Sequence, residues 1–503
     1  MNKLDEAKII ENSNAGVAQI TLLMKEINGG LLSQLNVLTE EVCTLNLQIK
    51  LLREENIKLL EKNAALEAKY NKNSKNSSKP PSTDNNKKPS NTRQKTDRST
   101  GGQPGHEGRT LLKIQNPDKF IAMKATACDC GCYLSDVEGK VNTRQVFELP
   151  KIAIEITEIS TYEVICPICK KVHKTEFPAS VTQPVQYGEN LQALMVYLSN
   201  YQLIPLSRTA ELISALTGQK ISQGTIVNVT KNLYHKLESA EIAIKEQLIK
   251  ADVLHSDETG MRSQGKINWV HSASTESFTH FAMHKKRGKQ AAIDIGILPA
   301  FEGTLVHDHW KTYYFFTDCT HAECNAHHIR NLKGIHENFS HEWAQDMASL
   351  LVKIKRQIES LKDEGHSQMS ENDIKVYELI YKEILEKGKL ECFEKSSKVL
   401  SKRTGKPLKT NAQRLLEKLE KYDIETLSFM YDFNIPFDNN LAERDIRMVK
   451  LRQKISGSFR GDNGGDWFCR IRSYASTCRK NGLDVMESLV NAIKGDPFMP
   501  SID

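Results

Sequence analysis

Leucine recurs every seven residues between Leu31 and Leu66, and this repeat constrains the chain more than any other feature of its sequence. A second position of the same seven-residue repeat is occupied in turn by Leu35, Val42, Ile49, Asn56 and Asn63. We call these two positions together the seam. Two seam positions sustained over about five heptads are typical of a coiled coil, in which a seam asparagine fixes the register and favours a dimer. We expect 31–70 to form a leucine-zipper-like coiled coil that self-associates, with Gly29-Gly30 breaking it from the lead 1–30. The alternative is an amphipathic helix that packs on its own protein.

The segment that follows, 71–110, loses its apolar residues and is rich in Ser, Asn, Pro, Gly and Lys. This composition predicts disorder. Nine basic residues face three acidic ones between Asn71 and Arg109, so the segment could collect DNA phosphates without reading sequence. A solvated linker without a partner is the other interpretation.

Overall composition excludes several classes of protein. The 503 residues correspond to about three domains, and no apolar run approaches the ~20 residues of a membrane span. The first residues lack the apolar core of a signal peptide. Eleven cysteines in such a chain favour thiols or metal ligands over a disulfide scaffold.

Five cysteines lie close together in 111–180, a segment that we expect to be a small, β-rich, zinc-binding domain. Cys166-x-x-Cys169 has the spacing that lets two thiolates bind one tetrahedral ion. The partner pair comes from Cys128, Cys130 and Cys132, none of which is spaced as C-x-x-C, and His173 is a spare ligand. Strand-like alternation from Val146 to Ile165 separates the two clusters. Buried free cysteines are the alternative to a structural Zn²⁺ site.

In residues 181–250 the apolar side chains recur with the period of a helix. A helix from Ser207 to Leu216 should end at Gly218, and Ser222 or Thr225 should open the next helix. Two helices joined by a short turn are compatible with a DNA-binding helix-turn-helix, although the same geometry occurs in any helical domain.

Two aspartates follow apolar, strand-like runs, and a glutamate opens a later helix. Strands over 251–257, 267–273 and 278–283, a helix over 289–298 and a strand ending at Asp308 make the opening of a ribonuclease-H-like fold. That order would place Asp257 beside Asp308, and Glu443 begins a basic helix. Three such carboxylates suit two divalent ions, Mg²⁺ or Mn²⁺, that act on a phosphodiester. Four other carboxylates are lower-ranked candidates for the same metal-binding role: Asp252, Glu258, Asp294 and Asp318.

The two parts of this expected core, 251–340 and 431–503, are separated by a charged segment, 341–430, that we expect to be an all-helical insertion. Cys324-x-x-His327 precedes it, and we interpret this pair as a local structural element beside the active site, since no second half of a zinc site lies nearby. The fold class is therefore multidomain, α+β or α/β.

The last segment combines basic and aromatic residues. Candidates for contact with DNA phosphates are Arg444, Arg447, Lys450, Arg452, Arg460, Arg470 and Arg472. Among them stand Phe459, Trp467, Phe468 and Tyr474, which either stack on unpaired bases or belong to the core.

As a set, these segments resemble the bacterial insertion-sequence transposases of the family numbered sixty-six. The resemblance spans nearly all of 31–489, and it is carried by NSSKPPS, GGQPGHEG, the cysteine pairs around RQVFELP, SQGT, HSDET, VHDHW, CNAHHIR, DNNLAERDIR and SGSFRGDNGG with NGLDV. Two departures stand out: CDCGC replaces a clean C-x-x-C, and HWKTYY follows Asp308 in place of the commoner glycine-tyrosine form.

The resemblance implies a DDE transposase with a leucine-zipper-like N-terminus, a zinc-finger-like domain and a ribonuclease-H-type catalytic domain. Asp257, Asp308 and Glu443 match the three catalytic acids of the family. Water would cut a phosphodiester at a transposon end, and the freed 3′-hydroxyl would attack target DNA. The expected partners are DNA, a second copy or a higher oligomer, and small accessory proteins of the same element, in the bacterial cytoplasm at the nucleoid. Alternatives are a catalytically silent DNA-binding relative and a structure-specific nuclease.

Overall fold

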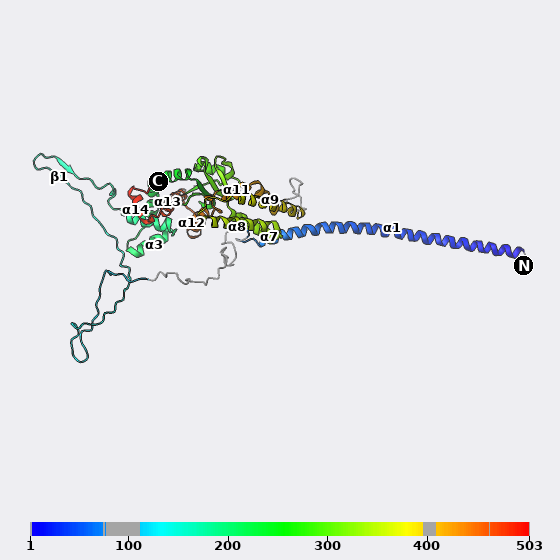
Figure 1. Ribbon diagram of the computed structural model, residues 1–503, viewed down its shortest axis with the longest axis horizontal. Coiled ribbons are helices and arrows are strands. Elements are labelled where there is room, and N and C mark those ends of the chain that lie inside the picture. The colour runs from blue at the N-terminus through cyan, green and yellow to red at the C-terminus, as the bar shows by residue number, and fades with distance from the viewer. Residues whose placement is uncertain (1–2, 74–75, 77–110, 396–408, 462, 502–503) are drawn as a thin grey trace. The chain divides into compact units, whose positions relative to one another are not determined.

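A computed structural model describes residues 3–73, 76, 111–395, 409–461 and 463–501 (Figure 1). The chain divides into two compact units. Unit 1 comprises Met1–Pro89 and Asn325–Phe433, and unit 2 comprises Ser90–Cys324 and Asn434–Asp503. Most of the expected basic linker, 77–110, lies outside the described residues. No helix in the described ranges is long and apolar enough to cross a membrane.

Unit 1 is helical. Its first element, α1, runs without interruption over Lys3–Tyr70 (Figure 1). The predicted break at Gly29-Gly30 is wrong, because a glycine inside a helix costs only about 1 kcal/mol and the helix-forming residues on both sides outweigh that cost. The heptad leucines from Leu31 to Leu66 are helical and more than half exposed.

The remaining helices of unit 1 are α7 (Asn325–Phe339), α8 (Glu342–Asp363), α9 (Glu371–Glu394), α10 (Asn411–Lys421) and α11 (Asp423–Tyr431). The predicted helical character of this segment is therefore present. Trp343 and Tyr381 are buried between these helices, and Gly388 leaves the space that the Trp343 ring occupies.

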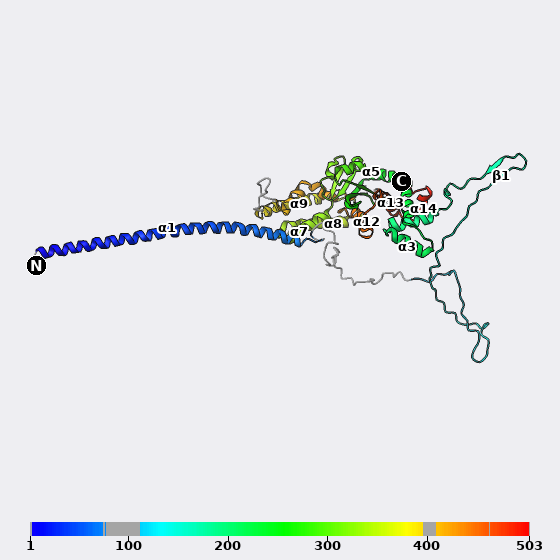
Figure 2. The same cartoon turned by 180° about the vertical axis from the view of Figure 1, so that it is seen from behind.

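Residues 111–188 of unit 2 differ from the β-rich domain that we expected. Figure 2 draws them as long loops, and their strands are β1 (Glu163–Ile165) and β2 (Val172–Lys174), which pair antiparallel. Of the stretch from Val146 to Ile165, in which alternation predicted a strand, only the last 3 residues form one. Apolar side chains such as Val146 and Ile156 stay exposed, so no core holds longer strands together.

Helices predicted from capping residues occur as expected. After α2 (Glu189–Val196) and a π-helical turn η2 (Tyr197–Tyr201), α3 (Leu206–Thr217) ends at Gly218, whose φ of 76° a glycine adopts without strain. Ser222 opens α4 (Gln223–Lys236) by accepting a hydrogen bond from the Thr225 amide. These helices share one core with α13 (Gly464–Lys480) and α14 (Val485–Lys494).

A five-stranded mixed sheet forms the centre of unit 2, in the order β5-β4-β3-β6-β7. The strands are β3 (Val253–Ser263), β4 (Lys266–Ser274), β5 (Thr279–His284), β6 (Thr304–His307) and β7 (Thr320–Glu323). The first three pair antiparallel, whereas β6 runs parallel to β3 and β7 parallel to β6. The predicted series of three strands, one helix and a fourth strand is present, with α6 (Lys289–Ile295) as the helix.

Both faces of the sheet are covered. Leu254 and Ala273 face a core shared with α5 (Glu238–Ile249), α6 and two short 3₁₀ turns, η3 (Leu298–Ala300) and η4 (Tyr313–Phe315). Met261 and Phe281 belong to a second core with α12 (Asn440–Ser456) and α13. Successive residues of a strand point to opposite faces, so Asp257 and Glu258 on β3 project to opposite sides. The fold is α+β with a mixed sheet.

Candidate active site

Asp257 lies on β3, and Asp308 directly follows β6, the parallel neighbour of β3. The register pairs Val253 with Thr304 and His255 with Val306, an offset of 51 positions in each case (304 − 253 and 306 − 255). The same offset carries Asp257 onto Asp308, which directly follows β6. Because parallel strands keep their register, Asp308 comes to the level of Asp257 at the point where β6 ends.

Glu443 is brought to the same region by Asn439, which precedes α12. The buried side chain of Asn439 bonds to His255 Nδ1 at 2.9 Å and donates to the Ser256 carbonyl at 2.8 Å. These two bonds fix the start of α12 on β3, and Glu443 lies in the first turn of that helix. This role of Asn439 was not predicted from the sequence, although the residue stands in the DNNLAERDIR motif.

The three acids influence one another electrostatically. Burial raises the pKa of Asp257 well above its usual range, and the charges of Glu258, Asp308 and Glu443 raise it further. Like charges that are gathered in a partly desolvated site repel one another, and a cation relieves that repulsion. Carboxylate oxygens are the ligands that Mg²⁺ prefers, so this donor set fits hard divalent ions.

Glu258, the nearest rival, is fully engaged by the protein. Its side chain is buried, and one oxygen accepts from Arg287 Nε and Nη2 at 2.9 and 2.6 Å while the other accepts from the Tyr313 hydroxyl at 2.6 Å. With both oxygens occupied, Glu258 organises the opposite face of the sheet. The other rivals, Asp252, Asp294 and Asp318, are exposed.

A buried cluster braces the loop after Asp308. Glu323, at the end of β7, bonds to His309 Nδ1 and accepts from the Tyr314 hydroxyl. Asp308 Oδ1 itself accepts from the Trp310 amide at 3.0 Å. This cluster holds the loop in one conformation, and nothing in the sequence pattern singled out Glu323.

Cys324 lies beside the third acid. Its buried sulfur accepts from the Asn439 amide at 3.2 Å and lies within 4.8 Å of a Glu443 carboxylate oxygen. His327 is on α7, in the other unit, where burial lowers its pKa to about 4.

Comparison with known protein families bears directly on this geometry. Residues 184–466, more than half of the 503, match the model of the Transposase IS66 family, and the match contains all three acids. The chain belongs to this transposase family. Residues 18–111 match a family of unknown function, DUF6444, and no curated protein matches the chain.

Within this transposase, the predicted phosphate-binding residues divide into two groups. Arg444, Arg447 and Arg460 are exposed, and Lys450 is exposed while it donates to the Gly260 carbonyl at 3.0 Å. Arg452 is partly buried, with its guanidinium 3.7 Å from the centre of the Phe459 ring. Exposed cations of this kind can meet a phosphate backbone.

Arg470 and Arg472 are instead bonded inside the protein, which corrects their proposed contact with DNA. Arg470 donates to Glu241 at 2.5 Å and lies over the Tyr234 ring. Arg472 is buried and donates to the Tyr201 carbonyl at 2.8 Å. Both hold α13 against the preceding helices, so neither reaches a phosphate.

The aromatic residues of the last segment are mostly core residues. Phe459, Phe468 and Tyr474 are each no more than 5% exposed, so the core interpretation holds for these three. Trp467 is only partly buried, and base stacking by that residue stays a prediction.

The predicted zinc ligands form two local turns. The Cys130 amide and thiol lower the pKa of Cys128, and the Cys169 and Ile168 amides do the same for Cys166. Favouring the thiolate suits zinc binding. None of the five cysteines, with Cys132 included, belongs to a group of three ligands within 4.8 Å in the part of the chain that the structure describes.

Proposed function

We propose that this transposase cuts and joins DNA at the ends of a mobile element, with Asp257, Asp308 and Glu443 holding two divalent metal ions. The observation that carries the proposal is the convergence of the three acids, two by strand register and one through Asn439. A ribonuclease-H-like core is part of the proposal, since the order β5-β4-β3-β6-β7 with three antiparallel and two parallel strands agrees with it.

When bound, Mg²⁺ or Mn²⁺ ions supply Lewis-acid activation of the attacking oxygen and stabilise the leaving oxygen. Asp257 on β3 and Asp308 directly after β6 would hold them, and Glu443 would complete the set from α12. In the first step, water forms a new P–O bond and the P–O3′ bond of the element end breaks. In the second step, the freed 3′-oxygen attacks a target phosphorus and displaces the target's own 3′-oxygen.

The exposed Arg444, Arg447, Lys450 and Arg460 line the helix that carries Glu443 and the loop after it. We infer that they bind the phosphates on either side of the cut. The α3–α4 pair is a candidate second DNA contact, because Ser222 and Gly218 give it the geometry of two helices joined by a short turn.

Self-association through α1 is also proposed. Its seam residues, such as Leu38 and Leu52, are more than half exposed along a helix of 68 residues. A second copy would cover this seam and pair two element ends.

For residues 111–188 we propose a structural Zn²⁺ ion. Its ligands would be Cys166, Cys169 and two of Cys128, Cys130 and Cys132. Metal analysis of Cys166→Ser tests this proposal.

The deciding experiment uses Asp257→Asn in the full chain. We expect it to lose Mg²⁺-dependent cleavage of a duplex that carries the terminal inverted repeat of the element, while it still binds that duplex. Joining of the cut ends to a target plasmid distinguishes transposition from simple nuclease activity. Full cleavage by Asp257→Asn would exclude the proposed site.

A further inference from the structure

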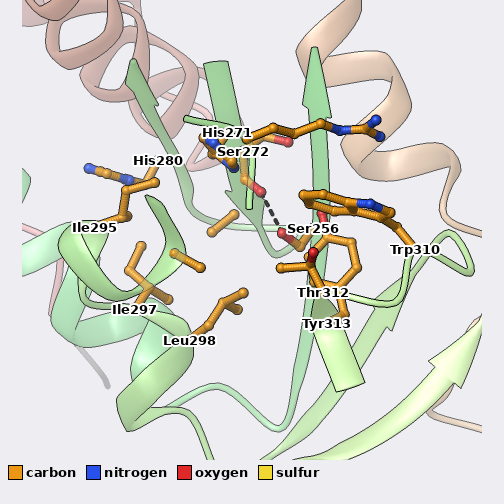
Figure 3. A pocket seen from close by; sticks show the side chains of 13 residues that line it. Ser256, His271, Ser272, His280, Ile295, Ile297, Leu298, Trp310, Thr312 and Tyr313 are labelled. Atoms are coloured by element: carbon orange, nitrogen blue, oxygen red, sulfur yellow. Dashed lines mark hydrogen bonds between the residues drawn. The ribbon is translucent and has the colours of Figure 1, made fainter. Parts of the chain in front are cut away.

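Two cavities of very different size lie along the central sheet in the part of unit 2 that the structure describes. Figure 3 shows the smaller one, where Trp310 and Tyr313 face Ile295, Ile297 and Leu298, and where Ser256 donates to the Ser272 carbonyl at 3.0 Å. Its volume of about 30 Å³ is close to the share of one water molecule. The larger cavity has a volume of about 470 Å³, within the range of ligand pockets.

The larger cavity lies along the β3–β4 hairpin, and α12 contributes one side. Its lining includes Gly260, Arg262, Trp269, Arg287, Lys450 and Gln453. The antiparallel register places Gly260 directly opposite Trp269. Because glycine has no side chain, the space in front of the indole stays open, and a Cβ at this position would lie 3.9 Å from the Trp269 ring.

Flat, polarisable groups form one wall. The Arg287 guanidinium lies 4.8 Å from the centre of the Trp269 ring and 4.3 Å from that of Trp310. The Glu258 carboxylate fixes its orientation through Nε and Nη2, and the Arg287 side chain remains 40% exposed. Indole and guanidinium planes are surfaces on which nucleobases stack.

The cavity is also positively charged. Arg287 is balanced by Glu258, whereas Arg262 and Lys450 form no ion pair among the described residues and bond to backbone carbonyls at 3.0 Å. An excess of cations beside a flat wall suits a ligand that combines an aromatic ring with a phosphate. That combination is a nucleotide.

The cavity is connected to the face of the sheet that carries Asp257 through Lys450. Glu258, in the lining, projects to the opposite face, whereas Lys450 comes from α12, 7 residues after Glu443 and roughly 10 Å along the helix axis. The Asp257 charge raises the pKa of Lys450 against the lowering effect of burial. Lys450 therefore links the cavity to the helix that carries the third acid.

We propose that this cavity receives one unpaired DNA base next to the phosphodiester that the acids cut. The inference rests on the function proposed above. Enzymes that do chemistry on a base take it out of the helix, and aromatic residues that stack on an unpaired base offset the lost stacking. Here Trp269 would stack on the base, while Arg262 and Lys450 would hold its phosphate.

The first test uses Asp257→Asn, which keeps the cavity but should not cut. Duplexes carrying the terminal inverted repeat are made with 2-aminopurine at successive positions around the cut. We expect one position to change its fluorescence on binding, because its neighbours change from bases to the Trp269 ring. Trp269→Ala in the same background should remove that change, and Trp269→Phe should keep most of it.

The second test measures cleavage. Trp269→Ala should cut an intact duplex about 5- to 100-fold more slowly, and a mismatch at the extruded position should restore most of the rate. Phe393→Ala removes an aromatic that is 81% exposed on α9 and should leave the rate unchanged. Unchanged melting temperatures exclude misfolding as the cause.

The outcomes separate the two proposals. Wild-type cleavage without any position-specific fluorescence change in Asp257→Asn would overturn the base-binding cavity and leave the catalytic proposal standing. A position-specific change that needs Trp269, in a protein that never cuts, would support the cavity and refute the catalytic proposal.

Discussion

Asp257 and Asp308 are 51 positions apart, which is also the register offset between β3 and β6. The pairing of β3 with β6 therefore brings Asp308, the residue after β6, to the level of Asp257. Only Glu443 depends on a distant segment of the chain, since it arrives on α12 after the helices of unit 1. Substituting an acid should therefore abolish cleavage directly, whereas substituting a residue that anchors α12 should lower cleavage by displacing Glu443.

Asp308→Asn should reduce Mg²⁺-dependent cleavage about 100-fold or more, because several kcal/mol of transition-state stabilisation is lost with a metal ligand. Binding of end DNA should persist or strengthen, since one negative charge is removed near the phosphates. Rates and binding are measured on the same duplex. Asp318→Asn, a change at an exposed acid ten positions later, is the matched control and should behave as wild type.

Asn439→Ala should lower cleavage roughly 10- to 100-fold although all three acids remain, because the start of α12 loses its bonds to β3. Removing a buried, hydrogen-bonded amide should also cost about 1–3 kcal/mol of unfolding free energy. Denaturant unfolding and single-turnover rates measure the two effects. Asn440→Ala, at the exposed neighbour, should change neither; an equal loss there would argue against a positioning role for Asn439.

Local signals in the sequence predicted the parts of the fold that depend on local physics. Ser222 and Gly218 predicted a helix start and a helix end because capping is a short-range effect. The order of strands and acids was likewise predicted, since the alternation of apolar and polar residues and the ends of strands are local features of the sequence. The helix that continues through Gly29-Gly30 was not predicted, because a propensity is outweighed by its neighbours.

Long-range partners could not be predicted in the same way. Arg472 looks like a phosphate ligand in the sequence, yet it is buried against Tyr201, 271 positions away. Glu258 looks like a rival catalytic acid, yet Arg287 and Tyr313 occupy both of its oxygens. Each of these contacts joins distant parts of the chain, and no periodicity or spacing encodes it.

Stability of the metal-free protein should fall as the pH drops below about 6.5. Burial lowers the pKa of His271 to about 4, and burial also lowers that of His280. Between about 4 and 6.5 the unfolded chain binds protons that the folded chain does not, so the stability is complete above the unfolded pKa and is lost as the pH falls. Each such histidine contributes about 1.4 kcal/mol per pH unit.

Urea unfolding of wild type and His271→Gln at pH 7 and pH 5 checks this expectation. The variant should lose less stability between the two pH values, whatever its absolute stability. An identical loss in both proteins would mean that His271 is not a buried neutral group.

Arg447→Gln should weaken binding similarly for specific and unrelated duplexes, because a phosphate contact carries no sequence information. The slope of log K against log salt should become shallower by about 1. Titrations at several salt concentrations measure it. Arg356→Gln removes an equally exposed charge on α8 in unit 1 and should leave the slope unchanged. Equal slopes for wild type and Arg447→Gln would exclude this contact.

Leu38→Asp combined with Leu45→Asp should convert the protein to monomers, because both leucines occupy the seam of α1 and a charge there cannot be buried against a second copy. Light scattering reports the mass. Leu47→Asp, on the same helix but outside the seam and 60% exposed, should keep the oligomer. If the double variant keeps the wild-type mass, the seam is not the interface. The double variant could also stay an oligomer, as wild type is, and still fail to join paired ends. In that case α1 pairs DNA ends and another surface maintains the assembly.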